Sequence, residues 1–198
     1  SANIDADDAI TFTGSATGYD KISVQGNVDF SDDTLTDVDE LEFDNGSTTV
    51  GGASTVEITV TQAQFAAIGV AGFTTVEDND LDNNNSILNL VEFGASPFDA
   101  TALDADINLG SITMMAGDIT LDPTTDLTGV SEIFVPEGGS ITLTAAQFQQ
   151  LDGNGTITSL NGFDLDTANA GPITINITDL TQADIDGGSF ILTGVDSG

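Results

Sequence analysis

The segment best suited to chemistry is a run of acids and amides at residues 77–85, which reads EDNDLDNNN. Asp78, Asp80 and Asp82 stand at alternate positions, and Asn84 continues the spacing with an amide oxygen. Ca²⁺ takes about 6–8 hard oxygen ligands and tolerates irregular geometry. We therefore predict a calcium site whose ligands are Asp78, Asp80, Asp82 and Asn84.

This acidic segment does not follow the EF-hand pattern. Asn83 stands where the turn glycine belongs, and Asn89 stands where the bidentate glutamate should be. The alternative to a calcium site is a solvated loop whose acids and amides only form turns. Two weaker clusters are candidates of the same kind: Asp5, Asp7 and Asp8, and Asp164 with Asp166.

Composition excludes most other catalytic and metal sites. The chain has no His and no Cys, so neither a Ser-His-Asp or Cys-His nucleophile nor a zinc site with those ligands can be built. Two carboxylates suffice for a glycosidase, but with 33 acidic residues such pairs occur everywhere by chance. The chain also lacks Trp and offers only Tyr19 besides its phenylalanines for stacking on a sugar. We predict that the protein is not an enzyme.

The charge of the chain limits its partners. The formal net charge is −32, and Lys21 is the only cationic side chain. Nucleic acids and anionic membrane surfaces both bind through cationic residues, so we expect neither as a partner. No apolar run approaches the roughly 20 residues that span a bilayer, so we expect no membrane insertion. A chain this acidic must tolerate self-repulsion, which salt screens and divalent cations neutralise.

The two halves of the chain carry the same segments in the same order. Three matched pairs are present: VDFSD (28–32) with ITLDP (119–123), LTDVDELEF (35–43) with LTGVSEIFV (127–135), and EITVTQAQFAAI (57–68) with SITLTAAQFQQL (140–151). We interpret them as two divergent copies of a unit of roughly 90 residues. The first copy is predicted over residues 1–95 and the second over residues 96–198, in one continuous elongated structure.

The elements that carry these segments read as short strands separated by turns. Apolar residues alternate with Thr, Asp or Asn in many of them, for example at 173–177, as in a strand with one face in a core. Ile112 and Ile133, like Ile119 and Ile141, recur at a step of about 20 residues, which stacked coils produce. We expect an all-β fold, a parallel β-solenoid-like stack of short strands with brief helical turns. A β-sandwich is the alternative.

Each copy also contains one of these helical turns. Thr61 precedes QAQFAAI and Thr144 precedes AAQFQQL. Ala and Gln favour helix, a Thr can cap its start, and Phe shares a face with the aliphatic residue three positions later. We predict short capped helices with a packing role at the end of a coil or at a corner.

The motif LTxVxEI…ITLTAAQF, present at residues 127–133 and 141–148, resembles repeats of very large bacterial surface proteins. These include long adhesins and S-layer-like proteins, many of them exported by type I secretion. The resemblance covers most of residues 27–68 and 118–160, and it implies an exported, calcium-tolerant, structural or adhesive role. The RTX nonapeptide GGxGxDxUx is absent, so its calcium sites are not transferred to this chain.

We therefore expect a structural subunit of an extracellular, self-assembling surface structure such as a filament, a sheath or an S-layer-like array. Its partners would be copies of itself, joined by β-edge or strand addition, with residues 1–13 as a donated strand. Two alternatives stay open: a monomeric spacer or adhesin module of a giant surface protein, and a calcium-dependent module that binds cell-surface glycans. The chain starts at Ser1 without Met, so we expect a processed start or a segment of a longer protein.

Overall fold

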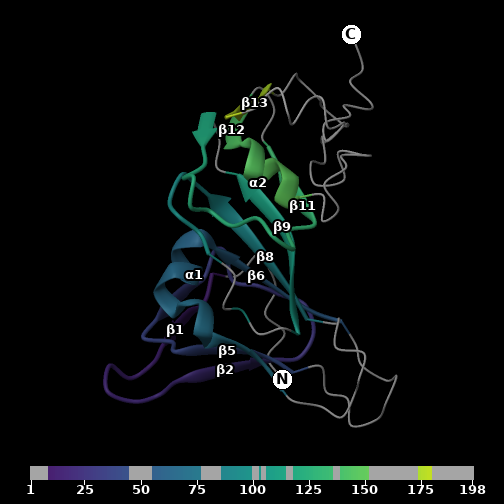
Figure 1. Cartoon of the computed structure of the whole chain (residues 1–198). Helices are drawn as coiled ribbons and strands as arrows, with labels where there is room; N and C mark the ends of the chain where they lie inside the picture. Colours follow the sequence, from purple (N-terminus) through teal and green to yellow (C-terminus); the bar gives the residue numbers. More distant parts are fainter. Residues whose placement is uncertain are drawn as a thin grey trace. The chain divides into compact units, whose positions relative to one another are not determined.

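A computed structural model describes residues 9–44, 55–76, 86–99, 103, 106–114, 118–135, 139–151 and 174–179 (Figure 1). The chain divides into two compact units. The first comprises Ser1–Val91 with Ala102–Gly110, and the second comprises Glu92–Thr101 with Ser111–Gly198. The described part consists of short strands, two α-helices and one 3-10 turn, so the fold class is all-β as expected. None of the helices in this part is long and apolar enough to cross a membrane.

The first unit is built from short strands. Successive sets of strands along the chain pair with one another, and we call each set a round. The strands of this unit are β1 (Thr11–Thr13), β2 (Lys21–Val24), β3 (Val28–Asp29), β4 (Thr34–Thr36), β5 (Glu40–Phe43), β6 (Val56–Thr61), β7 (Phe73–Thr75) and β8 (Ser86–Phe93). The first unit contains β8 only as far as Val91. The helix α1 (Gln62–Ile68) and the 3-10 turn η1 (Val70–Gly72) stand between β6 and β7.

Strands of successive rounds pair in the same order. β1 pairs with β4, β2 with β5, and β3 with β6, and β5 and β6 pair in turn with β7 and β8. The first round is therefore β1–β2–β3, the second is β4–β5–β6, and the third contains β7 and β8. All of these ladders are parallel.

The core of the first unit forms where alternate strand residues point inward. Ile58 and Val60 of β6 pair with Leu88 and Leu90 of β8, and all four side chains have an exposed fraction of 0%. Thr59, which lies between the two inward residues of β6, is partly exposed. The alternation read from the sequence thus stacks apolar residues in rows that run from strand to strand.

The second unit has the same kind of architecture. Its elements are β9 (Ile107–Met114), β10 (Asp118–Thr120), β11 (Glu132–Phe134), β12 (Ser140–Thr144), α2 (Ala145–Gln150) and β13 (Thr174–Thr178). The second unit contains β9 only from Ser111 onward. β9 pairs with β11, β10 with β12, and β12 with β13, again in parallel. The Cα partners include Ile112 with Ile133 and Ile119 with Ile141, which confirms the pairs predicted from isoleucine spacing.

The matched segments of the two sequence copies have the same local structure in both units. Val28 of β3 pairs with Ile58 of β6, and Ile119 of β10 pairs with Ile141 of β12, the positions that the sequence alignment equates. β6 runs into α1 and β12 runs into α2. The division into domains at residues 95 and 96 stays a prediction, because the compact units interleave along the chain between residues 92 and 110.

Both helices begin with the same cap. The side chain of Thr61 accepts a hydrogen bond from the N–H of Gln64, and the side chain of Gln64 accepts one from the N–H of Thr61. Thr144 and Gln147 make the same reciprocal pair at the start of α2. These capping boxes confirm the predicted Thr caps, because they satisfy N–H groups that lack a partner within the helix.

Candidate assembly surfaces

The first candidate surface is the side of the first round that faces away from the second round. We call it the first-round edge. Phe12, Ile22 and Val28 are partly exposed there, although Leu41 and Ile58, which pair with Ile22 and Val28, have an exposed fraction of 0%. Within the described part of the chain, β1, β2 and β3 each have one neighbouring strand. The first-round edge therefore presents apolar surface together with backbone groups that face away from their ladder.

The second candidate surface is the free side of β13, which we call the β13 edge. Ile175 and Ile177 are partly exposed, whereas their partners on β12, Ile141 and Leu143, have exposed fractions of 0% and 1%. β13 lies at the end of its ladder, with β12 as its neighbour among the described strands. The inner row of the second unit is thus well covered at β12 and only partly covered at β13.

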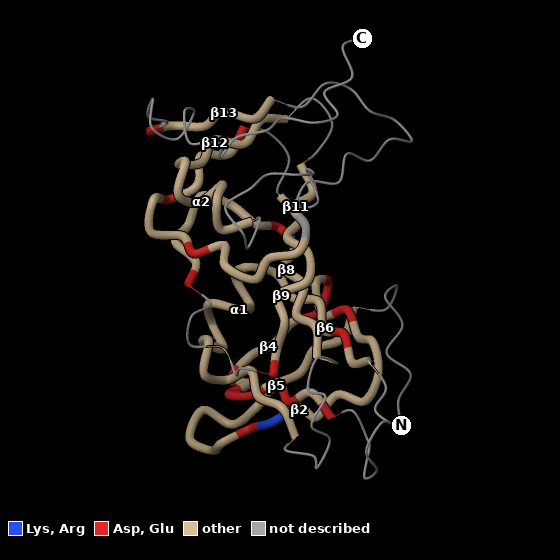
Figure 2. The backbone as a smooth tube through the Cα atoms, turned by 45° about the vertical axis from the view of Figure 1, so that its right-hand side comes forward, with Lys and Arg blue, Asp and Glu red and all other residues tan. Residues whose placement is uncertain are grey.

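Acidic residues are scarce at both edges. β13 reads TINIT and β1 reads TFT, with no acid in either, and β2 carries Lys21, the only cation of the chain. The one acid among these strands is Asp29 at the end of β3. Figure 2 shows the single blue position at β2, and the Nζ of Lys21 lies 2.6 Å from an oxygen of Glu42 on β5. Like-charge repulsion at the two edges is therefore small for a chain with 33 acids.

Hydrogen bonds to acidic residues connect the three rounds of the first unit. Glu40 of β5 is 7% exposed and accepts hydrogen bonds from the hydroxyls of Tyr19 and Thr74, the latter at 2.5 Å. The N–H of Asp20 donates to Asp39 at 2.8 Å. Protein donors thus already bind these carboxylates. No group of three or more acids in the described part of the chain is arranged to hold a metal ion.

The predicted calcium ligands lie outside the described residues. They are Asp78, Asp80, Asp82 and Asn84, and the weaker candidates Asp5, Asp7, Asp8, Asp164 and Asp166 also lie outside. Asn89, which occupies the position of the EF-hand glutamate, lies in β8, and its side chain donates to Glu57 at 2.6 Å. Calcium binding at residues 77–85 stays a prediction.

The prediction that residues 1–13 form a donated strand is wrong for Thr11–Thr13. These residues form β1 and pair in parallel with β4 of their own chain. Phe12 pairs with Leu35 in that ladder, and its ring packs edge-on against Phe30 with centroids 5.8 Å apart. One side of this strand is therefore already paired within the chain.

The side chains of Gln64 and Gln147 have a role that sequence reasoning missed. The Nε2 of Gln64 donates to the carbonyls of Phe30 and Asp33 at 2.7 and 2.9 Å. The Nε2 of Gln147 donates to the carbonyls of Asp122 and Thr125 at 2.7 and 3.1 Å. We call this arrangement the glutamine clamp. It anchors the helix to the turn after β3 or β10, and the recurrence of Gln at the third helix position in both copies was the available signal.

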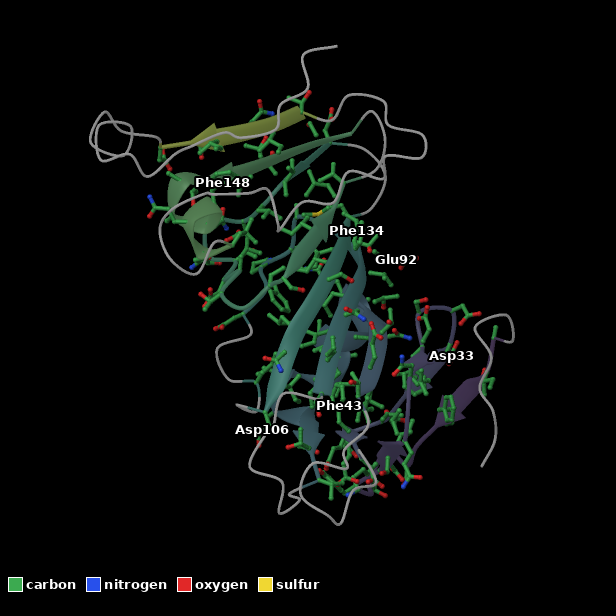
Figure 3. The ribbon with its side chains drawn as sticks, turned by 90° about the vertical axis from the view of Figure 1, so that its right-hand side faces the viewer. Asp33, Phe43, Glu92, Asp106, Phe134 and Phe148 are labelled. Carbon is green, nitrogen blue, oxygen red and sulfur yellow. The ribbon has the colours of Figure 1, made fainter. Side chains whose placement is uncertain are left out.

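Each clamped turn contains a buried oxygen without a hydrogen-bond partner. In the first unit it is Oδ2 of Asp33, and in the second it is Oγ1 of Thr125, at the position equivalent to Asp33 beside the clamp. The other carboxylate oxygen of Asp33 accepts from the N–H of Ile10 at 2.7 Å. Figure 3 labels Asp33 in the first unit. Each of these unpartnered oxygens costs free energy, since it is buried without a hydrogen-bond donor.

Asp122 shapes the turn of the second unit electrostatically. The hydroxyl of Thr124 donates to Oδ1 of Asp122 at 2.6 Å, and the N–H of Thr124 donates to the same oxygen at 2.8 Å. The hydroxyl first and the N–H second lower the pKa of Asp122 below its ordinary value, and desolvation opposes them. The ionised carboxylate therefore stabilises the turn that the clamp of Gln147 holds.

Comparison with known proteins gave no match. No family model, no curated protein and no solved structure matches the chain.

Proposed function

We propose that this protein is a structural module of an extracellular surface assembly whose copies join through strand edges. The observation that carries the proposal is the pair of partly covered layers, with Phe12, Ile22 and Val28 in one and Ile175 and Ile177 in the other. Stacked repeats need polar outer layers to stay soluble alone, and an uncovered edge accepts a further strand. Layers of this kind fit a protein that is covered by a neighbour.

The architecture that best suits this role is a parallel β-solenoid. Successive rounds pair in parallel in the same order, and their inward residues stack in rows. A β-sandwich, the alternative, is built from antiparallel sheets. A solenoid grows by adding rounds, so its terminal rounds are natural joints between molecules.

Charge and composition support an extracellular place and a structural role. A net charge of −32 with one cation suits a medium that supplies salt or divalent cations. The absence of His and Cys removes the usual nucleophiles and general bases. The resemblance of LTxVxEI…ITLTAAQF to repeats of bacterial surface proteins points the same way.

The duplication favours a second candidate function, a spacer or adhesin module that works as a monomer. The same glutamine clamp at Gln64 and Gln147 supports the interpretation of two copies of one unit, as expected of a repeat-built spacer. In a longer protein, neighbouring repeats of the same chain would cover the layers at Phe12 and Ile175. Such a module would set the distance between the cell surface and the part of the longer protein that binds the ligand.

The test is the size of the protein in solution, measured by light scattering and negative-stain microscopy. The measurement is made in high salt with calcium and again after chelation. Ordered filaments or sheets support the proposal, and their loosening on chelation would make Asp78, Asp80 and Asp82 the first residues to replace by Asn. A monomer under every condition overturns self-assembly and supports the spacer or adhesin module.

A further inference from the structure

We infer that copies of this chain associate head to tail, with the β13 edge of one copy against the first-round edge of the next. The inference rests on the proposed self-assembly and adds to it the two surfaces, the partner and the symmetry. β13 pairs with β12 on one side, and its other side would receive one strand of the first round of a second copy.

Coverage of the inner rows is the first argument. Ile141 and Leu143 on β12 are sealed by their neighbours, whereas Ile175 and Ile177 on β13 are partly exposed. In the first round, Ile22 is partly exposed while its partner Leu41 is buried, although Val24 on the same strand is 4% exposed. Leu35, the partner of Phe12, is partly exposed. A first-round strand of a second copy would cover Ile175 and Ile177 on β13, and the same contact would cover part of the first-round edge. Burial of the exposed parts of these aliphatic side chains removes apolar surface from water, which favours association.

The order of repeats is the second argument. β3 corresponds to β10 and β6 to β12, because the two ladders share register, cap and clamp. β13 pairs with β12 as β8 pairs with β6, so β13 corresponds to β8. Along the chain, the strands that follow β8 are β9 and β10, the round whose counterpart opens the chain. In this sequence, a strand equivalent to β13 is therefore followed by strands that include the equivalent of first-round strand β3. The first round of a second copy is for this reason a suitable neighbour for β13.

Strand direction is the third argument. Every ladder between described strands for which a register is defined is parallel. A two-fold joint between two copies of β13 would pair these strands in opposite directions, which no such ladder does. A parallel joint uses two different surfaces, so each added copy keeps one free edge and addition continues into a filament or closes into a ring.

Charge is the fourth argument. The strands of the joint, TINIT on one side and TFT, KISV and VD on the other, contain one acid and one cation. By contrast, β5 alone carries Glu40 and Glu42. A chain with 33 acids thus brings together two edges whose described strands carry one acid between them, which reduces the repulsion that opposes association.

The test blocks one edge at a time. One variant carries Ile175→Glu and Ile177→Glu, and the other carries Ile22→Glu. Sizes are measured by light scattering in high salt, alone and after mixing in equal amounts. We expect each variant alone to stay monomeric and the mixture to form dimers of doubled mass, because each variant keeps the edge that the other lacks.

Three results would overturn head-to-tail association. The first is a first-round variant that dimerises alone while the β13 variant stays monomeric, which indicates a two-fold joint. The second is assembly of both variants as in the unmodified chain, which places the joint elsewhere. The third is a mixture that stays monomeric although both variants keep their circular dichroism.

Two controls separate these results from other failures. Ile175→Val with Ile177→Val keeps the apolar edge and is expected to assemble, so it distinguishes loss of the edge from loss of the fold. Failure of the unmodified chain to assemble overturns the proposed function itself, whereas assembly with the wrong pairing of variants overturns only the head-to-tail inference.

Discussion

The two clamped turns differ in what surrounds the same glutamine. In the first unit, Asp33 stands beside the clamp and its side chain holds the N–H of Ile10. In the second unit that place is taken by Thr125, and a different side chain, Gln150, accepts from the N–H of Leu127 at 2.9 Å. Both units share the clamp, but the other side-chain hydrogen bonds near the clamped turn differ between them. The comparison indicates that the helix-to-turn anchor is the feature the repeat requires.

Removal of the clamp should have the largest effect. Gln147→Ala leaves two carbonyls without their donor and is expected to lower the free energy of unfolding by about 2–4 kcal/mol. Gln64→Ala should cost less, because Gln64 is partly exposed whereas Gln147 is 2% exposed. Urea unfolding followed by circular dichroism measures both. Equal losses below about 0.5 kcal/mol would show that the clamp is not the shared anchor.

Removal of a helix cap should have the second-largest effect on the free energy of unfolding. Thr61→Ala and Thr144→Ala each remove a side-chain acceptor from the first turn and are expected to cost about 1 kcal/mol. The effects should match in the two units, since both capping boxes have the same geometry. The same unfolding experiment checks this. Thr→Ser at each position keeps the acceptor and serves as the control, and a cost for Ser equal to that for Ala would contradict a capping role.

The unpartnered oxygen of Thr125 allows a substitution that stabilises. Thr125→Val removes a buried hydroxyl that lacks a partner and should raise the free energy of unfolding by about 1 kcal/mol. Asp33→Asn keeps the acceptor for Ile10 but puts an N–H donor in place of the unpartnered oxygen, so no gain is expected there. Thr125→Ser keeps the hydroxyl and should give no gain. A loss of stability with Val would mean that the hydroxyl has a partner in solution.

The smallest effect should come from Asp122. Thr124→Ala removes the hydroxyl that lowers the pKa of Asp122, so this pKa should rise toward its ordinary value. Because the folded pKa lies below the unfolded one, the stabilising contribution is complete above the unfolded pKa and is lost as pH falls through the folded pKa. An NMR titration of the carboxyl carbon measures the shift. An unchanged pKa in the variant would contradict the assigned cause.

Residue spacing predicted several strands and strand pairs, but it did not predict which strands lie at the edge of a described ladder. The pairs Ile112–Ile133 and Ile119–Ile141 were predicted because strands that stack at a steady step place equivalent residues side by side. The alternation at 173–177 predicted a strand, found at Thr174–Thr178. It did not reveal that this strand lies at the end of its described ladder, since the same alternation occurs in covered β12.

The sequence by itself determined the all-β class, the two matched sets of segments, the Thr-capped helices and the exclusion of chemistry that needs His or Cys. These properties depend on local backbone preference, periodicity and composition, which every residue carries with it. Only the tertiary structure decided that Gln64 and Gln147 clamp distant turns, that Thr11–Thr13 pairs within its own chain, and that Ile175 and Ile177 are left partly exposed. Those outcomes depend on which segments, far apart in the sequence, become neighbours and so compete for the same partners.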